Sequence, residues 1–152
     1  MKVRSLLSIA ALGLASAAPA VAETMLNVVS AGDQNMVDYV NNYLGPKFEQ
    51  MNPGVKVRAV GTGPGDSGSQ KIYEKLEAQR KAGSATWDVD VAVVHQRGAA
   101  TMVNEKLLMP YRNDIAAGKL VSRDTAKNAL GANVDGYVLP MFHSQIAFAY
   151  NP

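Results

Sequence analysis

Four short polar clusters in the sequence carry side chains that could bind a ligand. They are Gly32-Asp33, the glycine-rich stretch with Thr62, Gly63, Asp66, Ser67 and Ser69, then His95-Gln96-Arg97, and finally His143-Ser144-Gln145. Hydroxyl, amide and imidazole groups hydrogen-bond to small polar molecules, and an arginine fork can clamp a carboxylate or phosphate. We therefore predict that these residues line a site for a small polar solute.

The glycine-rich stretch resembles two nucleotide-binding motifs, and neither fits. A P-loop requires lysine and then serine or threonine after its last glycine, whereas Ser69-Gln70 follows Gly68. The spacing of Gly63, Gly65 and Gly68 matches a dinucleotide fingerprint, with Asp88 and Asp90 about 20 residues later. These acids begin the next apolar run, whereas the ribose-binding acid must end it. A surface loop without a ligand role remains open as an alternative.

The residue types give little indication of a metal site or a catalytic site. His95 and His143 are the only histidines and there is no cysteine, whereas a zinc site needs at least a third ligand. We predict no metal, no cofactor and no enzymatic activity. No Gly-x-Ser-x-Gly elbow occurs, but spacing cannot exclude a pairing of Ser144 with His143 or of Ser67 with Asp66. An exported hydrolase therefore stays open as an alternative, as does a periplasmic ligand sensor.

The first 22 residues have the composition of a signal peptide. Lys2 and Arg4 precede an uncharged run over 6–18, and Ala20-Val21-Ala22 offers a cleavage site. Cleavage after Ala22 would leave 130 of the 152 residues, with thirteen basic residues (the fifteen less Lys2 and Arg4) against thirteen acidic ones. This neutral chain gives no electrostatic reason to bind nucleic acid or an anionic membrane. Without cysteine it has neither disulfides nor a lipoprotein anchor, so we expect it to be free in the periplasm and not inserted in the membrane.

Apolar periodicity predicts alternating strands and helices in the remainder of the chain. We expect strands at 25–29, 55–60, 88–94, 137–142 and 146–150, and helices near 37–51, 69–82 and 98–104. The first helix should turn one stripe toward the sheet, formed by Val37, Val40, Leu44, Phe48 and Met51. The nearly continuous apolar run at 88–94 predicts a central strand, and Trp87 should pack in the core.

This order predicts an α/β fold with a mostly parallel sheet flanked by helices. Ligands bind outside the carboxyl ends of the strands in such sheets. All four polar clusters follow predicted strands, which places them together at that edge.

Three sequence segments resemble those of the family 1 extracellular solute-binding proteins of ABC transporters. They are the helix, proline-glycine turn and strand at 43–57, the aspartate-led strand at 87–91, and the stretch at 136–151. The resemblance implies one lobe of a two-lobe periplasmic-binding-protein fold, which closes on its solute and docks on an ABC permease in the inner membrane. It implies a signal peptide at 1–22, an N-terminal lobe at 23–145 and the start of the hinge at 146–152. We expect a fragment that lacks the second lobe and a monomeric protein; the solute could be a sugar, a polyol phosphate, a carboxylate or a polyamine.

Overall fold

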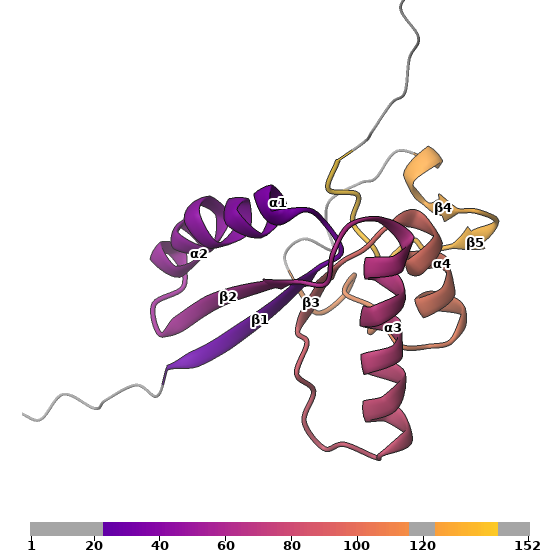
Figure 1. The fold of residues 1–152 in the computed structure, drawn as a ribbon, viewed down its shortest axis with the longest axis horizontal. Coiled ribbons are helices and arrows are strands. Elements are labelled where there is room, and N and C mark those ends of the chain that lie inside the picture. Colours follow the sequence, from indigo (N-terminus) through magenta and orange to yellow (C-terminus); the bar gives the residue numbers. More distant parts are fainter. Residues whose placement is uncertain (1–22, 116–123, 143–152) are drawn as a thin grey trace, which may run out of the picture.

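The computed structural model describes residues 23–115 and 124–142, and it has an α/β architecture (Figure 1). The elements are β1 (Thr24–Ser30), α1 (Gln34–Tyr39), the π-helical turn η1 (Val40–Leu44), α2 (Gly45–Met51), β2 (Val55–Gly61), α3 (Gly65–Lys81), β3 (Val91–Val93), α4 (Gln96–Asn104), the 3-10 turn η3 (Asp124–Ala126), β4 (Asn128–Ala129) and β5 (Ala132–Asn133). The predicted signal peptide and the expected strand at 146–150 lie outside the described residues.

Three parallel strands form the main sheet in the order β2-β1-β3. Ser30 pairs with Gly61 on one side and with Val93 on the other, so the three strands end level with one another. The predicted parallel α/β fold is therefore confirmed.

The prediction that 88–94 forms a central strand is wrong for the described residues. β3 has three residues and lies at the edge of the three-stranded sheet, and Val91 is 43% exposed. The strand is short because Asp90 turns its carboxylate to β1, where it accepts a bond from the Asn27 N–H at 2.7 Å. β1 lies at the centre because the first crossover places β2 on one side of it, and the second crossover, from β2, places β3 on its other side.

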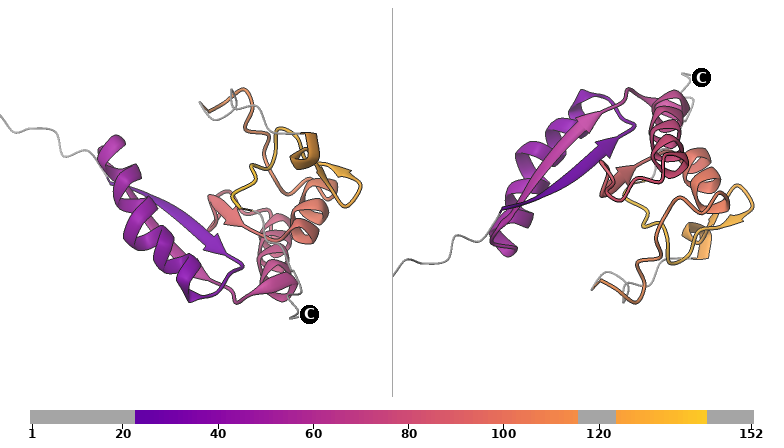
Figure 2. Two further views of the ribbon diagram at one scale, coloured as in Figure 1. Left: turned by 90° about the horizontal axis from the view of Figure 1, so that it is seen from above. Right: turned by 90° about the horizontal axis from the view of Figure 1, so that it is seen from below.

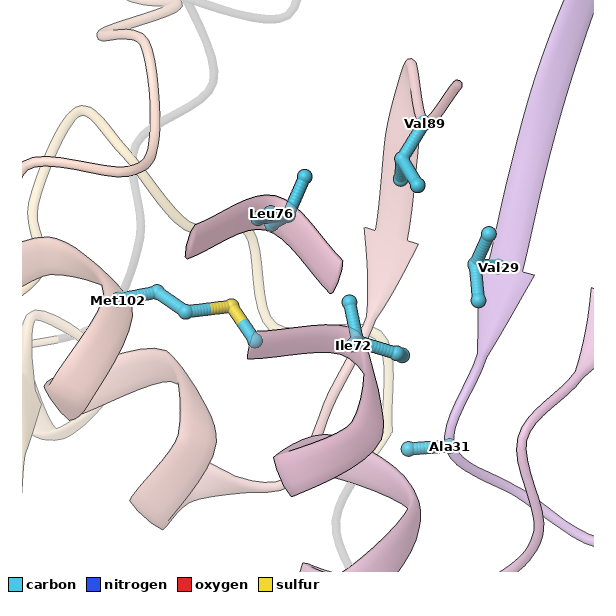
Figure 3. Close-up of a cluster of buried hydrophobic side chains, with 6 residues drawn as sticks. All are labelled: Val29, Ala31, Ile72, Leu76, Val89 and Met102. Carbon is cyan, nitrogen blue, oxygen red and sulfur yellow. The ribbon is translucent and has the colours of Figure 1, made fainter. Parts of the chain in front are cut away.

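Helices cover the two faces of β1 (Figures 1 and 2). On one face, Val28 and Ala59 pack against Val37 and Val40 of α1 and η1. On the other face, a second cluster joins β1 to α3 and α4 (Figure 3); it contains Val29, Ala31, Ile72, Leu76, Val89 and Met102. Ile72 and Met102 are the largest fully buried apolar side chains among the described residues. This cluster fixes where α3 and α4 begin relative to the end of β1.

The helix at 34–51 contains a wide turn that the sequence analysis missed. Pro46 has no N–H to donate to the carbonyl four residues earlier, and its ring crowds that carbonyl. The chain accommodates this with the π turn η1, directly before Gly45 and Pro46. A π turn holds one extra residue, so the face that follows it shifts by one position along the sequence.

This shift explains why only two of the five residues of the predicted apolar stripe are buried. Val37 and Val40 are buried, but Leu44, Phe48 and Met51 are 37%, 39% and 72% exposed. After the π turn the sheet-facing positions fall one residue later, at Gly45 and Glu49. Gly45 is buried against Val57, and Glu49 accepts a bond from the Val57 N–H.

The C-terminal part of the described chain forms a small hairpin that the sequence analysis did not predict. β4 and β5 pair antiparallel through a two-residue turn in which Leu130 and Gly131 both have positive φ, 50° and 91°. Such turns match the twist of paired strands. The hairpin packs on α4, where Ala129 and Ala132 contact Ala100.

Two further expectations are wrong for the described residues. No strand forms over 137–142, because the N–H groups of Tyr137 and Val138 both bond the Val134 carbonyl in a turn and Pro140 has no N–H. Trp87 does not pack in the core and is 41% exposed. Trp87 lies before β3, in a segment that is not part of the sheet.

Candidate ligand-binding site

Three of the four predicted clusters lie side by side at the carboxyl end of the sheet. The Thr62 N–H donates to the Ser30 carbonyl at 2.9 Å, and the Ala31 N–H donates to the Val93 carbonyl at 2.8 Å. The imidazole Nε2 of His95 lies 3.1 Å from the Ala31 carbonyl oxygen. These bonds join the loops after β1, β2 and β3 into one surface. The fourth cluster, His143-Ser144-Gln145, lies outside the described residues.

The glycine-rich stretch is shorter as a loop than predicted. α3 begins at Gly65, four residues before the predicted start at Ser69, because the chain turns sharply at Gly63 and Gly65, whose φ angles are +95° and +73°. A Cβ on Gly68 would lie 1.9 Å from the Gly63 carbonyl oxygen. Backbone conformation at Gly63 and Gly65 and close packing at Gly68 therefore account for these glycines without a nucleotide.

Ser69 supports the surface from below. Its side chain is 1% exposed. Its hydroxyl accepts a bond from the His95 N–H at 3.0 Å and donates to the Gly65 carbonyl at 3.4 Å. Ser69 thus ties the start of α3 to the end of β3 and positions His95. The hydroxyl bonds the backbone of His95 and not its ring, so this pair does not form a nucleophile and base.

The remaining predicted residues present polar groups at the surface. Asp33, Asp66, Ser67, His95, Gln96 and Arg97 are exposed, and Gly32, Thr62 and Gly63 are half-buried. Thr62 donates its hydroxyl to the Gly68 carbonyl at 2.9 Å. Arg97 Nε donates to Asp66 Oδ2 at 3.0 Å, which links the first turn of α4 to the first turn of α3.

The sequence did not indicate that Lys71 reaches this region or that Ser30, at the end of the first strand, is buried. Lys71 Nζ donates to the Thr62 carbonyl at 3.2 Å, so a cation from the second turn of α3 reaches the loop after β2. Ser30 ends the central strand with no exposed surface, and its hydroxyl has no hydrogen-bond partner among the described residues. The spacing of Lys71 suggested only an outward helix position. A serine that ends an apolar strand gave no signal of burial.

Two hollows in the described part of the chain lie elsewhere. One, of about 390 Å³, is apolar and lined by Met36, Tyr39, Leu44, Met141 and Phe142. The other, of about 320 Å³, is lined by Asn27, Val28, Val29, Arg58, Val60, Lys75, Trp87 and Asp88. Neither includes a predicted ligand residue. The strand-end residues thus offer an open polar surface, the form expected of one wall of a groove.

Residues 23–115 and 124–142 contain neither a metal-binding cluster nor a membrane-spanning helix. No group of three or more histidine and acidic side chains is arranged to hold a metal ion in these ranges. Within the same ranges, no helix has both the length and the apolar character needed to cross a membrane.

The fold and the strand-end surface define a lobe of an α/β binding protein. Residues 33–152 match the bacterial extracellular solute-binding protein family. The chain therefore belongs to this family, and the resemblance predicted from the sequence is confirmed. Members of this family are extracellular solute-binding proteins. No curated protein matches the chain.

Proposed function

We propose that this chain is the N-terminal lobe of a periplasmic solute-binding protein, which captures a small polar solute and delivers it to an ABC permease in the inner membrane. The observation that carries the proposal is the level ending of the three strands. Ser30 pairs with both Gly61 and Val93, and this register brings three polar loops to one edge. Membership of the solute-binding family supports the same function.

The proposed site is one wall of a cleft between two lobes. Solute would contact the exposed groups of Asp33, Ser67, His95, Gln96 and Arg97, with Gly32, Thr62, Gly63 and Asp66 beside them and Ser69 beneath. His143, Ser144 and Gln145 complete the proposed set. A second lobe would form the opposite wall, with the hinge starting near 146–152. Closure is favoured when the solute contacts both lobes only in the closed state.

A thermal-shift screen of the complete protein tests solute capture. Sugars, polyol phosphates, carboxylates, amino acids and polyamines are added separately, and a ligand that binds the folded state raises the melting temperature. At 100 times the Kd, the gain in stability is about 2.7 kcal/mol. A protein that none of these solutes stabilises would contradict the proposal.

Two variants assign the binding to the strand-end surface. Arg97→Ala removes an exposed arginine from the proposed site, whereas Arg58→Ala removes an exposed arginine from the hollow beside Trp87. We expect only the first to reduce the shift caused by a solute that binds. If both variants reduced the thermal shift equally, the result would contradict a solute site at the strand ends. Uptake of that solute by cells with and without the permease tests the transport role.

A further inference from the structure

Asp66 and Arg97 form an ion pair between two helices at the strand-end surface. Arg97 Nε donates to Asp66 Oδ2 at 3.0 Å, and the two side chains are 58% and 73% exposed for Asp66 and Arg97 respectively. An ion pair this exposed adds little to the stability of the fold, because water and salt screen it. Its main consequence is therefore geometric, since it holds the plane of the guanidinium.

The ion pair leaves the outer end of Arg97 available. A guanidinium has five N–H donors, of which Asp66 takes the one on Nε. No described residue accepts a hydrogen bond from Nη1 or Nη2 of Arg97. These donors can bind two oxygens of one carboxylate or phosphate. A fixed guanidinium loses less side-chain entropy on binding than a freely rotating one.

Two helix starts add positive potential beside Arg97. α3, with 17 residues, and α4, with 9 residues, both begin at this surface. Their N-cap residues, Pro64 and His95, make no side-chain capping bond. The first-turn N–H groups then carry the partial positive charge of the helix ends, which favours an anion. The charges of Asp66 and Arg97 cancel one another, so the ion pair does not offset the positive potential of the helix starts.

We propose that Asp66 is a positioning residue for Arg97 and that the captured solute carries a carboxylate or phosphate group bound by Arg97. The inference rests on the proposed function, because it takes the strand-end surface as the solute site. Asp66 contributes through its acceptor oxygen, since its negative charge by itself opposes an anionic solute.

Charge-matched variants separate these two effects of Asp66. Asp66→Asn removes the charge and keeps an oxygen that accepts the Arg97 Nε–H, whereas Asp66→Ala removes both. Any difference between the two therefore reports the hydrogen bond alone. Arg97→Lys keeps the cation and removes the fork.

A second contact between the same helices provides a matched control. Arg80, near the end of α3, donates from Nη1 to the Glu105 carbonyl at 2.5 Å, and its Nη2 lies 3.9 Å from Glu105 Oε2. Glu105 follows the last residue of α4, at the opposite end from the strand-end surface. Glu105→Gln therefore weakens the side-chain contact between the helices without touching Arg97.

The experiment uses the complete protein labelled with ¹⁵N and follows the arginine Nε–Hε signals during titration. Inorganic phosphate and succinate are the anionic probes, and glucose is the neutral one. We expect both anions, or one of them, to shift the Arg97 signal. The anion that binds should bind Asp66→Ala about five-fold more weakly than Asp66→Asn, as expected for one lost charge-assisted bond at an exposed site. Glu105→Gln should bind as the unchanged protein does, and Arg97→Lys should lose most of the affinity.

The possible results separate this inference from the proposed function. Equal anion affinity of Asp66→Ala and Asp66→Asn would overturn the positioning role. A protein that ignores both anions but binds glucose at the strand ends would overturn the anionic class and leave the proposed function standing. Failure of every solute in the thermal-shift screen would overturn both. Circular dichroism of each variant, matched to the unchanged protein, ensures that a loss of affinity reports the site.

Discussion

The side-chain amide of Asn41 bonds both backbone groups of Ala59. Nδ2 donates to the Ala59 carbonyl at 3.0 Å, and Oδ1 accepts from the Ala59 N–H at 2.8 Å. Ala59 lies in β2, at the edge of the sheet, where these groups would otherwise face an unpaired side. Asn41 thus takes the place of a neighbouring strand. It reaches this position because η1 turns it toward β2.

Asn41→Ala should destabilise the protein by about 1–3 kcal/mol, because both groups of Ala59 lose their partner in a partly buried place. Urea unfolding followed by circular dichroism measures the change. Asn42→Ala is the matched control, since Asn42 is an exposed neighbour in the same turn. Equal stabilities of the two variants would show that the amide of Asn41 does not support β2.

Much of the fold follows from local patterns in the sequence. The apolar runs at 25–29 and 55–60 and the pattern near 98–104 predicted β1, β2 and α4, because short strands and an amphipathic helix have clear periods. A parallel sheet aligns its strand ends, so the order of strands and helices was enough to place the clusters around Gly32, Thr62 and His95 together.

The rest depends on features without a periodic signal. The π turn before Pro46 shifts the helix face by one residue, so a stripe counted at regular spacing points Leu44 and Phe48 to the wrong side. The hairpin of β4 and β5 is too short to show a period of two. At the site, the ion pair of Asp66 with Arg97 joins residues 31 positions apart, which spacing alone cannot identify.

Gly68→Ala should be more damaging than Gly65→Ala, although both glycines belong to the same motif-like stretch. A Cβ on Gly68 would lie 1.9 Å from the Gly63 carbonyl oxygen and 3.2 Å from the Ala31 Cα, so backbone must move at a cost of about 3 kcal/mol. A Cβ on Gly65 meets open space and opposes only a φ of +73°, which costs roughly 1–2 kcal/mol. Thermal unfolding of both variants gives the order, and the reverse order would contradict the packing explanation.

Glu49 should make stability depend on pH in the acid range. The Val57 N–H donates to its Oε1 at 2.8 Å and Lys56 donates to its Oε2 at 3.1 Å. These two bonds, the backbone one first, hold the pKa of Glu49 below its ordinary value of 4.5. A carboxyl with a lowered pKa stabilises the fold above the unfolded-state pKa, and this contribution is lost as the pH falls through the folded-state pKa.

The melting temperature of Glu49→Gln should therefore fall less between pH 7 and about pH 3 than that of the unchanged protein, because the neutral amide does not titrate. Glu74→Gln is the control, since it removes an exposed carboxylate of α3 whose hydrogen bond within the described part of the chain is to the side chain of Gln70. The same acid dependence in the unchanged protein and in Glu49→Gln would exclude Glu49 as a source of it.

Ser30 and Ser69 are both buried, and their substitution by alanine should have opposite effects. The Ser30 hydroxyl has no partner among the described residues, so Ser30→Ala removes an unsatisfied polar group and should leave the stability unchanged or raise it by about 1 kcal/mol. The Ser69 hydroxyl accepts the His95 N–H, and Ser69→Ala leaves that donor unpaired at a cost of about 1–3 kcal/mol. Guanidinium unfolding of the two variants in parallel measures both signs. A loss of stability in Ser30→Ala as large as that in Ser69→Ala would contradict this prediction. It would mean that the Ser30 hydroxyl makes a hydrogen bond that the described residues do not supply, at the strand end beside the proposed solute surface.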